Sequence, residues 1–144
     1  MSDAAEVIER WIDGLPEEGT VERVREGFWY VRIPGVARSW IPIEIEAGER
    51  TVKLTSHVII EPEERVEEVY VLLLRHNHAA TGTTFSIDGR EGVICLVGRI
   101  PVDELDEERL DEMVGQTVQE TEQTFRSILQ IGFGSRLRKP RRGA

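Results

Sequence analysis

The amino-acid sequence predicts an α+β domain, a mostly antiparallel sheet with helices packed on one face in the order α-β-β-β-α-β-β-α. Apolar residues recur at helical spacing in three segments. The segments between them are rich in valine, isoleucine and aromatic residues and largely alternate apolar with polar positions. Short turns join consecutive strands, which favours antiparallel pairing. A chain of 144 residues has the usual length of one domain and can bury one core without disulfides.

The first helix is expected between Ser2, which can cap its amino end, and Gly14 with Pro16, which end it. Its apolar stripe consists of Val7, Ile8, Trp11 and Ile12. Residues 20–35, TVERVREGFWYVRIPG, are then expected as one strand that Gly27 can break.

Residues 38–60 predict two strands around a turn at Ala47 and Gly48. In the first of these strands the two faces differ in chemistry. One face carries Ile41, Ile43 and Ile45, and the other carries Trp40, Pro42, Glu44 and Glu46. Because proline has no N–H to donate to a ladder, Pro42 predicts an edge strand or a bulge.

The second helix is expected to start at Pro62 and to continue through the apolar run VYVLLL, which predicts a well-buried helix. Residues 83–101 then form a hairpin, with VICLVG as a central strand. The last helix is expected to begin at a cap on Asp103 and to end at Gly132 and Gly134.

The segment RHNH brings two histidines close together near the end of the second helix. His76 and His78 are two residues apart, so on a helix they point roughly 200° apart and cannot share a metal ion. Asn77 is a residue that often ends a helix, and histidines there complement the helix dipole. We therefore expect a structural role for both. A metal-dependent enzyme built on His57, His76 and His78 is the third-ranked hypothesis.

No other motif predicts chemistry. The chain has no phosphate-binding loop, nucleophile elbow or HExxH zinc motif, and Cys95 lies in an apolar strand that would keep its thiol inert. We therefore expect no catalytic, cofactor-binding or metal-binding residues, and no cofactor. No apolar run approaches the roughly 20 residues of a membrane span, and the first residues lack a signal-peptide pattern. The expected location is the cytoplasm.

Charge divides the chain into a domain, residues 1–134, and a basic flexible tail, residues 135–144. The chain carries −9 and the last ten residues contribute +5, so the remainder carries −14 and should repel phosphate backbones. Binding of nucleic acid or an acidic partner is therefore expected only through the tail. Its basic residues are Arg136, Arg138, Lys139, Arg141 and Arg142.

Two tryptophans in the strands are candidate protein-binding residues. A sheet covered on one face leaves the other face free, and aromatic side chains there would mark a binding surface. Trp29 and Trp40 are the candidates. The alternative for each is packing beneath the first helix or its neighbours.

Several segments together resemble the YbjN domain family in its actinobacterial form. They are GERTVKLTSHVI, EEVYVLLLRHN, TTFSIDGREGVICLVGRIPVDELDEERLDEMVG and ILQIGF, and the resemblance runs from about Gly27 to Phe133. The more specific parts are LLLR-x-N at Leu72–Asn77 and VGR-I-P at Val97–Pro101, which bear on fold rather than activity.

This resemblance implies a type III secretion chaperone-like fold and a sensory transduction regulator with no agreed catalytic residues to carry over. We therefore expect a non-enzymatic protein-binding module, chaperone-like or a regulatory adaptor, that forms a homodimer and binds an unidentified protein. The alternative is a regulator that contacts nucleic acid through its basic tail.

Overall fold

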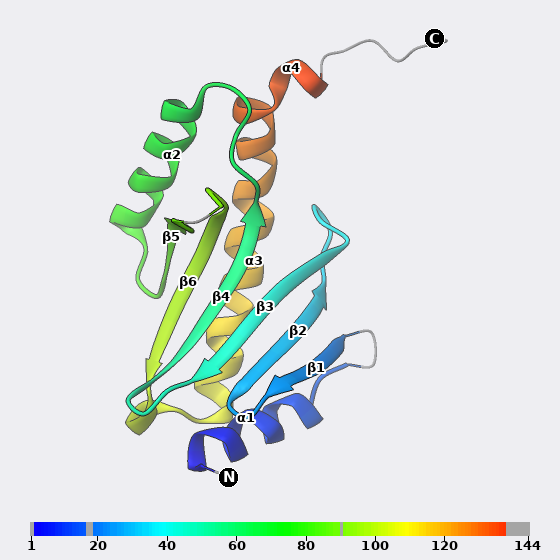
Figure 1. Ribbon diagram of the computed structural model, residues 1–144, viewed down its shortest axis with the longest axis vertical. Helices are drawn as coiled ribbons and strands as arrows, with labels where there is room; N and C mark the ends of the chain where they lie inside the picture. The colour runs from blue at the N-terminus through cyan, green and yellow to red at the C-terminus, as the bar shows by residue number, and fades with distance from the viewer. Residues whose placement is uncertain (1, 17–18, 90, 138–144) are drawn as a thin grey trace.

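The computed structural model describes residues 2–16, 19–89 and 91–137 (Figure 1). Its elements are α1 (Asp3–Asp13), β1 (Thr20–Arg25), β2 (Phe28–Pro34), β3 (Trp40–Ala47), β4 (Thr51–Ile59), α2 (Val66–Ala79), β5 (Thr83–Ile87), β6 (Ile94–Pro101), a 3-10 turn η1 (Val102–Glu104), α3 (Glu107–Gly132) and α4 (Gly134–Leu137). The α+β class is confirmed.

The strands of the described residues form one antiparallel sheet in the order β1-β2-β3-β4-β6-β5. The long helix α3 runs behind β4 and β3 in Figure 1, α1 lies at the lower end near β1 and β2 and contacts α3, and α2 stands beside β5 at the upper end. None of the helices in the described residues covers the opposite face of the sheet, which we call the open face.

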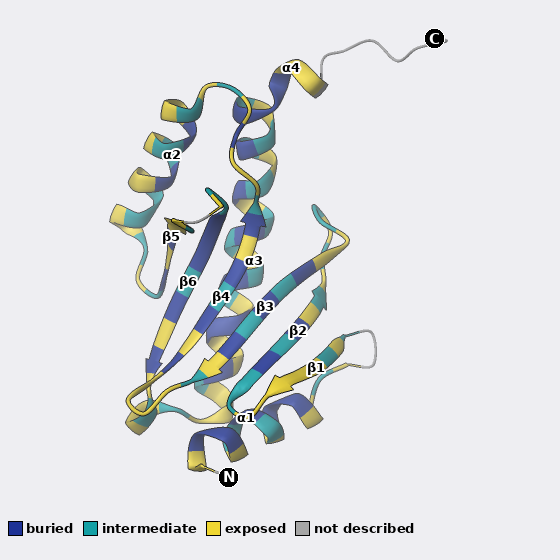
Figure 2. Cartoon of the chain, viewed as in Figure 1, coloured by how far each residue is buried: buried dark blue, intermediate teal, exposed yellow. Residues whose placement is uncertain are grey.

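The core fills the space between the sheet and its helices. Ile41, Ile43 and Ile45 on β3 are fully buried, as their alternation predicts, and the same alternation is visible along β4 and β6 in Figure 2. Two clusters divide this core: a larger one under α1 and the first half of α3, and a smaller one between α2, β5 and the second half of α3.

The segment expected as one strand is a hairpin of two strands. Gly27 has a φ of 77°, in the left-handed region that favours glycine, and Ala47 N–H donates to its carbonyl oxygen over 2.8 Å. The chain therefore turns at Gly27, so β1 pairs with β2 and one more strand precedes α2 than the sequence predicts.

The strand that contains Pro42 lies inside the sheet. It pairs with β2 along its length, whereas its ladder with β4 extends only from Glu44 and Thr55 to Ala47 and Val52. Beyond that point Arg38 Nη1 donates to the carbonyl oxygen of His57 over 2.8 Å. Pro42 lies just beyond this end of the ladder and has no N–H to donate. The Arg38 side chain instead supplies a donor to the main chain of β4 there.

Two helix starts differ from those expected. Helix α2 begins at Val66 rather than at Pro62, because the N–H groups of Glu63 and Glu64 both donate to the carbonyl oxygen of Gly132 over 3.0 Å. Helix α3 is capped by Asp106, which accepts from Arg109 N–H, and the expected cap Asp103 lies in η1.

Candidate protein-interaction site

Helix α2 is only half buried, although the run VYVLLL predicts a well-buried helix. Val69 and Leu73 are buried against β5 and α3, whereas Val71 is 45% exposed and Leu74 is 67% exposed. Only one stripe of α2 faces the core, because the helix stands at the edge of the sheet and not over its middle. The remaining apolar side chains lie at the surface.

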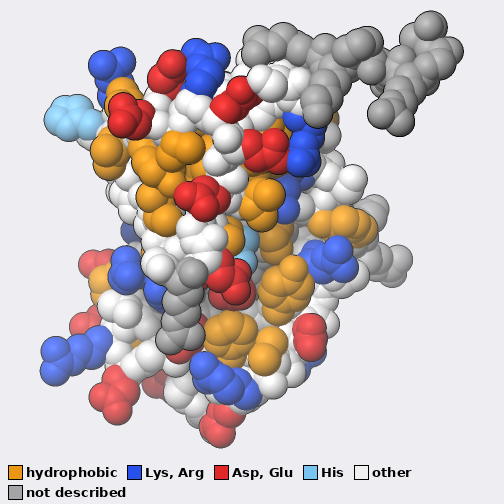
Figure 3. Space-filling model, turned by 45° about the horizontal axis from the view of Figure 1, so that its top comes forward, with side chains coloured by type: hydrophobic (Ala, Val, Ile, Leu, Met, Phe, Trp, Pro, Cys, Tyr) orange, Lys and Arg blue, Asp and Glu red, His pale blue; other side chains and the backbone are white. Residues whose placement is uncertain are grey.

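Of these two side chains, Leu74 borders a groove between α2 and β5, which we call the α2–β5 groove. It has a volume of about 290 Å³, and its lining residues are Tyr70, Leu73, Leu74, Asn77, Phe85, Ser86 and Ile87. Ile87 at its rim is 46% exposed. Figure 3 shows hydrophobic side chains gathered at this end of the molecule. Exposed apolar side chains grouped around a concavity are typical of a protein-binding surface.

Asn77 fixes the position of α2 against β5. Its Nδ2 donates to Phe85 O over 2.9 Å, and Phe85 N–H donates to its Oδ1 over 2.7 Å. Asn77 lies inside α2, so it does not end the helix as expected from the sequence. Its amide instead occupies the outer edge of β5, which would otherwise offer a free donor and a free acceptor to another strand.

The two histidines of α2 face different surroundings, as their helical spacing predicts. His76 Nε2 lies 3.3 Å from Glu120 Oε2 on α3, and the imidazole packs edge-on against Phe85 with 5.2 Å between ring centroids. Glu120 also accepts a hydrogen bond from Thr83 Oγ1. His78 is exposed. His76 therefore helps to join α2, α3 and β5.

A second hollow lies on the other side of α2, and we call it the α2 outer hollow. It has a volume of about 430 Å³. Its lining residues are Glu67, Glu68, Val71, Leu72, Arg75 and Ile131. All but Ile131 come from α2, so one helix supplies both its apolar floor and its charged rim.

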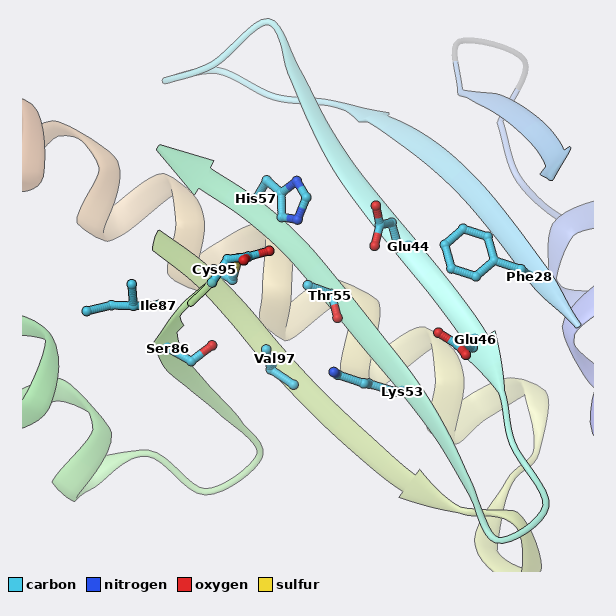
Figure 4. Close-up of a pocket in the computed structure, with 11 residues that line it drawn as sticks. Phe28, Glu44, Glu46, Lys53, Thr55, His57, Ser86, Ile87, Cys95 and Val97 are labelled. Carbon is cyan, nitrogen blue, oxygen red and sulfur yellow. The ribbon is translucent and has the colours of Figure 1, made fainter. Parts of the chain in front are cut away.

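The open face carries a third hollow, of about 270 Å³ (Figure 4). Its lining residues are Phe28, Glu44, Glu46, Lys53, Thr55, His57, Ser86, Ile87, Asp88, Cys95 and Val97. His57 and Cys95 are cross-strand neighbours, but burial raises the pKa of the Cys95 thiol, which makes it a poor nucleophile. In the described parts of the chain no group of three or more His, Cys, Asp or Glu residues could hold a metal ion.

The two candidate tryptophans lie in different places. Trp29 is 4% exposed, packs in the core under α1 and donates from Nε1 to Glu9 Oε1 over 2.9 Å. It follows the packing alternative, so we no longer expect it to contact a partner. Trp40 lies on the open face, is 37% exposed and has the Arg32 guanidinium 5.5 Å from its ring centre. Its binding role stays a prediction.

The first part of the predicted tail is structured. Residues 135–137 belong to α4, where Ser135 N–H and Oγ both donate to the Glu64 carboxylate over 2.6 Å and Arg136 pairs with Glu63. The other basic residues expected to contact an acidic partner are Arg138, Lys139, Arg141 and Arg142, and they lie outside the described residues.

The family is decided by a comparison with known proteins. The model of YbjN, described as "Putative bacterial sensory transduction regulator", matches residues 4–130. The chain belongs to the YbjN family. It is also similar to uncharacterized proteins of Mycobacterium tuberculosis, 30% identical over 109 residues, and Mycobacterium leprae, 31% identical over 109 residues. The matched segment is 76% of this chain and 59% of each of these longer relatives. The chaperone-like fold stays a prediction.

The family description names no binding residue. Among the helices of residues 2–16, 19–89 and 91–137, none is long and apolar enough to cross a membrane. The α2–β5 groove was missed in the sequence, although one signal was there: the apolar run of α2 is wider than the stripe that a single core contact needs.

Proposed function

We propose that this YbjN protein is a non-enzymatic, cytoplasmic regulatory adaptor that holds an apolar segment of a partner protein in the α2–β5 groove. The single observation that carries the proposal is the exposure of Leu74 and Ile87 on either side of that groove, at 67% and 46%. Leaving such side chains in water is unfavourable, and a partner that covers them recovers roughly 25 cal/mol per Å² of apolar surface.

Both edges of the sheet are protected against pairing with another strand. This favours a partner that places its side chains in the groove over one that adds a strand to the sheet. On β5, Asn77 already occupies the main-chain groups of Phe85. On β1, a register shift between Arg23 and Arg25 and charged side chains protect the other edge. A partner segment therefore binds through its own apolar side chains, as an amphipathic helix does in a groove.

The family description supports a regulatory setting, and the arrangement of Cys95 and His57 supports a role without catalysis. We further propose that the adaptor works as a homodimer, the commonest oligomeric form. Trp40 is kept as a second proposed contact, because it lies exposed on the open face, away from the α2–β5 groove.

Photo-crosslinking in the native cell tests this function. A benzophenone amino acid replaces Leu74, and the matched control places it at Val24 on β1, which is also exposed, at 51%. We expect a discrete adduct with another protein from position 74 and none from position 24. The partner identified by mass spectrometry is then titrated against the purified parent, Leu74→Asp and Trp40→Ser.

Leu74→Asp should weaken binding at least tenfold, since truncating a central apolar contact typically costs 2 kcal/mol or more. Its thermal stability should stay close to that of the parent, because the side chain is largely outside the core. Equal adducts from both positions would refute the groove. Parent-like binding by Leu74→Asp with loss in Trp40→Ser would move the site to the open face.

A further inference from the structure

We infer that the α2 outer hollow is the contact between two copies of this chain, which meet with their α2 helices antiparallel across a two-fold axis. The inference rests on the proposed homodimer and names its surface. It uses the side of α2 turned away from the α2–β5 groove, so the two surfaces share the helix and not their lining residues.

The charges along this side of α2 are sorted by sign. Glu67 and Glu68 lie in its first turn, Val71 and Leu72 in its middle, and Arg75 toward its carboxyl end. A copy turned end over end presents the opposite order, acid against base at both ends. The pattern is therefore complementary to itself under a two-fold rotation, which is the requirement for an isologous interface.

The helical geometry brings these groups into register. Glu68 and Arg75 are seven residues apart, so they project from nearly the same side of α2, about 10 Å apart along its axis. An axis between Val71 and Leu72 then brings each Glu68 opposite Arg75 of the second copy. The apolar residues meet at the centre, and the two charge pairs flank them.

The charged groups are available for such pairs. Arg75 forms no ion pair with any other described residue, and Glu68 pairs only with Arg65, three residues before it on the exposed side of the chain. Val71 is 45% exposed, so the centre of the surface is uncovered in the single chain. Another partner would need this same sequence of acid, apolar and basic groups, which a second copy supplies by symmetry.

The overall charge opposes the contact and makes the test sharper. Each copy carries −9, so two copies repel, although salt at 0.15 M screens charges beyond about 8 Å. Glu68→Arg makes each copy less negative and would strengthen a dimer limited by overall repulsion. The proposed contact gives the opposite sign, because the introduced guanidinium would then face Arg75 of the second copy at both ends.

Sedimentation equilibrium of the full chain tests the inference with four samples: the parent, Glu68→Arg, Arg75→Glu and the double variant with both changes. We expect the parent to be a dimer at micromolar concentration and each single variant to dissociate at least about tenfold more readily, since like charges in an interface strongly disfavour it. The double variant, with the parent's net charge, should recover the parent's dissociation constant. Melting temperatures check that all four fold.

A mixture of the two single variants supplies a further arm. Each alone repels itself, yet together they form a heterodimer with two opposite-charge pairs, so the mixture should associate about as tightly as the parent. A monomeric parent would refute the proposed homodimer itself. A dimeric parent whose single variants associate unchanged would refute only the α2 contact. If position 74 forms adducts only with a second copy of this chain and not with another protein, the contact between copies extends across the groove. That result would refute the assignment of the groove to a different partner protein.

Discussion

Replacing Asn77 tests how the α2–β5 groove is held together. The Asn77 amide makes two hydrogen bonds to the main chain of Phe85, at 2.9 and 2.7 Å, and both are partly buried. A typical intramolecular hydrogen bond contributes about 1 kcal/mol net. Asn77→Ala should therefore lower the free energy of unfolding by about 2 kcal/mol. For a chain of this length that corresponds to a melting temperature roughly 4–8 °C lower.

Asn77→Asp separates the two bonds. Its carboxylate still accepts from Phe85 N–H but cannot donate to the Phe85 carbonyl oxygen. Amide hydrogen exchange of Phe85 is the assay, with the Leu96 amide on the neighbouring strand β6 as the control. In Asn77→Ala the Phe85 amide should exchange at least about tenfold faster relative to Leu96, whereas in Asn77→Asp it should stay protected.

Unchanged relative exchange of the Phe85 amide in Asn77→Ala would refute the reasoning. It would mean that α2 is held on β5 by apolar packing alone and that the edge of β5 is closed by other means. The groove would then be free to open as α2 moves, and its fixed shape could not select a partner.

Three further predictions follow from the packing and the charges. Gly98→Ala places a methyl group 2.5 Å from Met113 Sδ, so it should destabilise the protein by about 1–3 kcal/mol, and a combined Gly98→Ala and Met113→Ala variant should lose less than the two single losses added. Hydrogen bonds from Arg23 and then Trp29 lower the pKa of Glu9. The ionised Glu9 carboxylate therefore stabilises the folded protein above its ordinary pKa of 4.5, and this stabilisation is lost as the pH falls through the lowered pKa. Urea unfolding of the parent and Glu9→Gln should therefore differ at pH 7 and converge in acid; an equal difference throughout would contradict this. His78→Ala should change the stability by less than about 0.5 kcal/mol and His76→Ala by about 1–2 kcal/mol, with background zinc in each; stoichiometric zinc in the parent, lost in the double variant, would overturn the structural role.

Periodicity predicted which residues face the core wherever a long element packs on one side. The alternation of Ile41, Ile43 and Ile45 and the cap on Ser2 are both found, because each depends on local geometry alone. Local rules failed where a distant segment completes the structure. The chain at Pro62 is not helical because the N–H groups of the next two residues donate to the carbonyl oxygen of Gly132, which lies seventy residues after Pro62. No local sequence pattern indicates that contact.

The two tryptophans illustrate the limit for the site. Alternation places Trp40 on the same face as Glu44 and Glu46, but the run FWYVRI around Trp29 does not alternate clearly, and neither pattern tells which face a helix covers. Register decides: Trp29 pairs with the buried Ile45, while Trp40 pairs with Pro34 on the open face. The groove was out of reach for a related reason. An apolar run shows that a helix has apolar sides. Only the position of α2 at the edge of the sheet determines which of these sides is left uncovered by the rest of the protein.

The two surfaces of α2 differ in the kind of interaction they offer. The α2–β5 groove is lined mostly by apolar side chains, whose burial depends little on salt, whereas the α2 outer hollow adds Glu67, Glu68 and Arg75, whose pairs weaken as salt rises. Partner binding and self-association should therefore respond differently to ionic strength in the same sample. Because both surfaces use one helix held to β5 by Asn77, loosening that helix should impair both together. A variant that affects only one therefore acts on the surface itself and not on the position of α2.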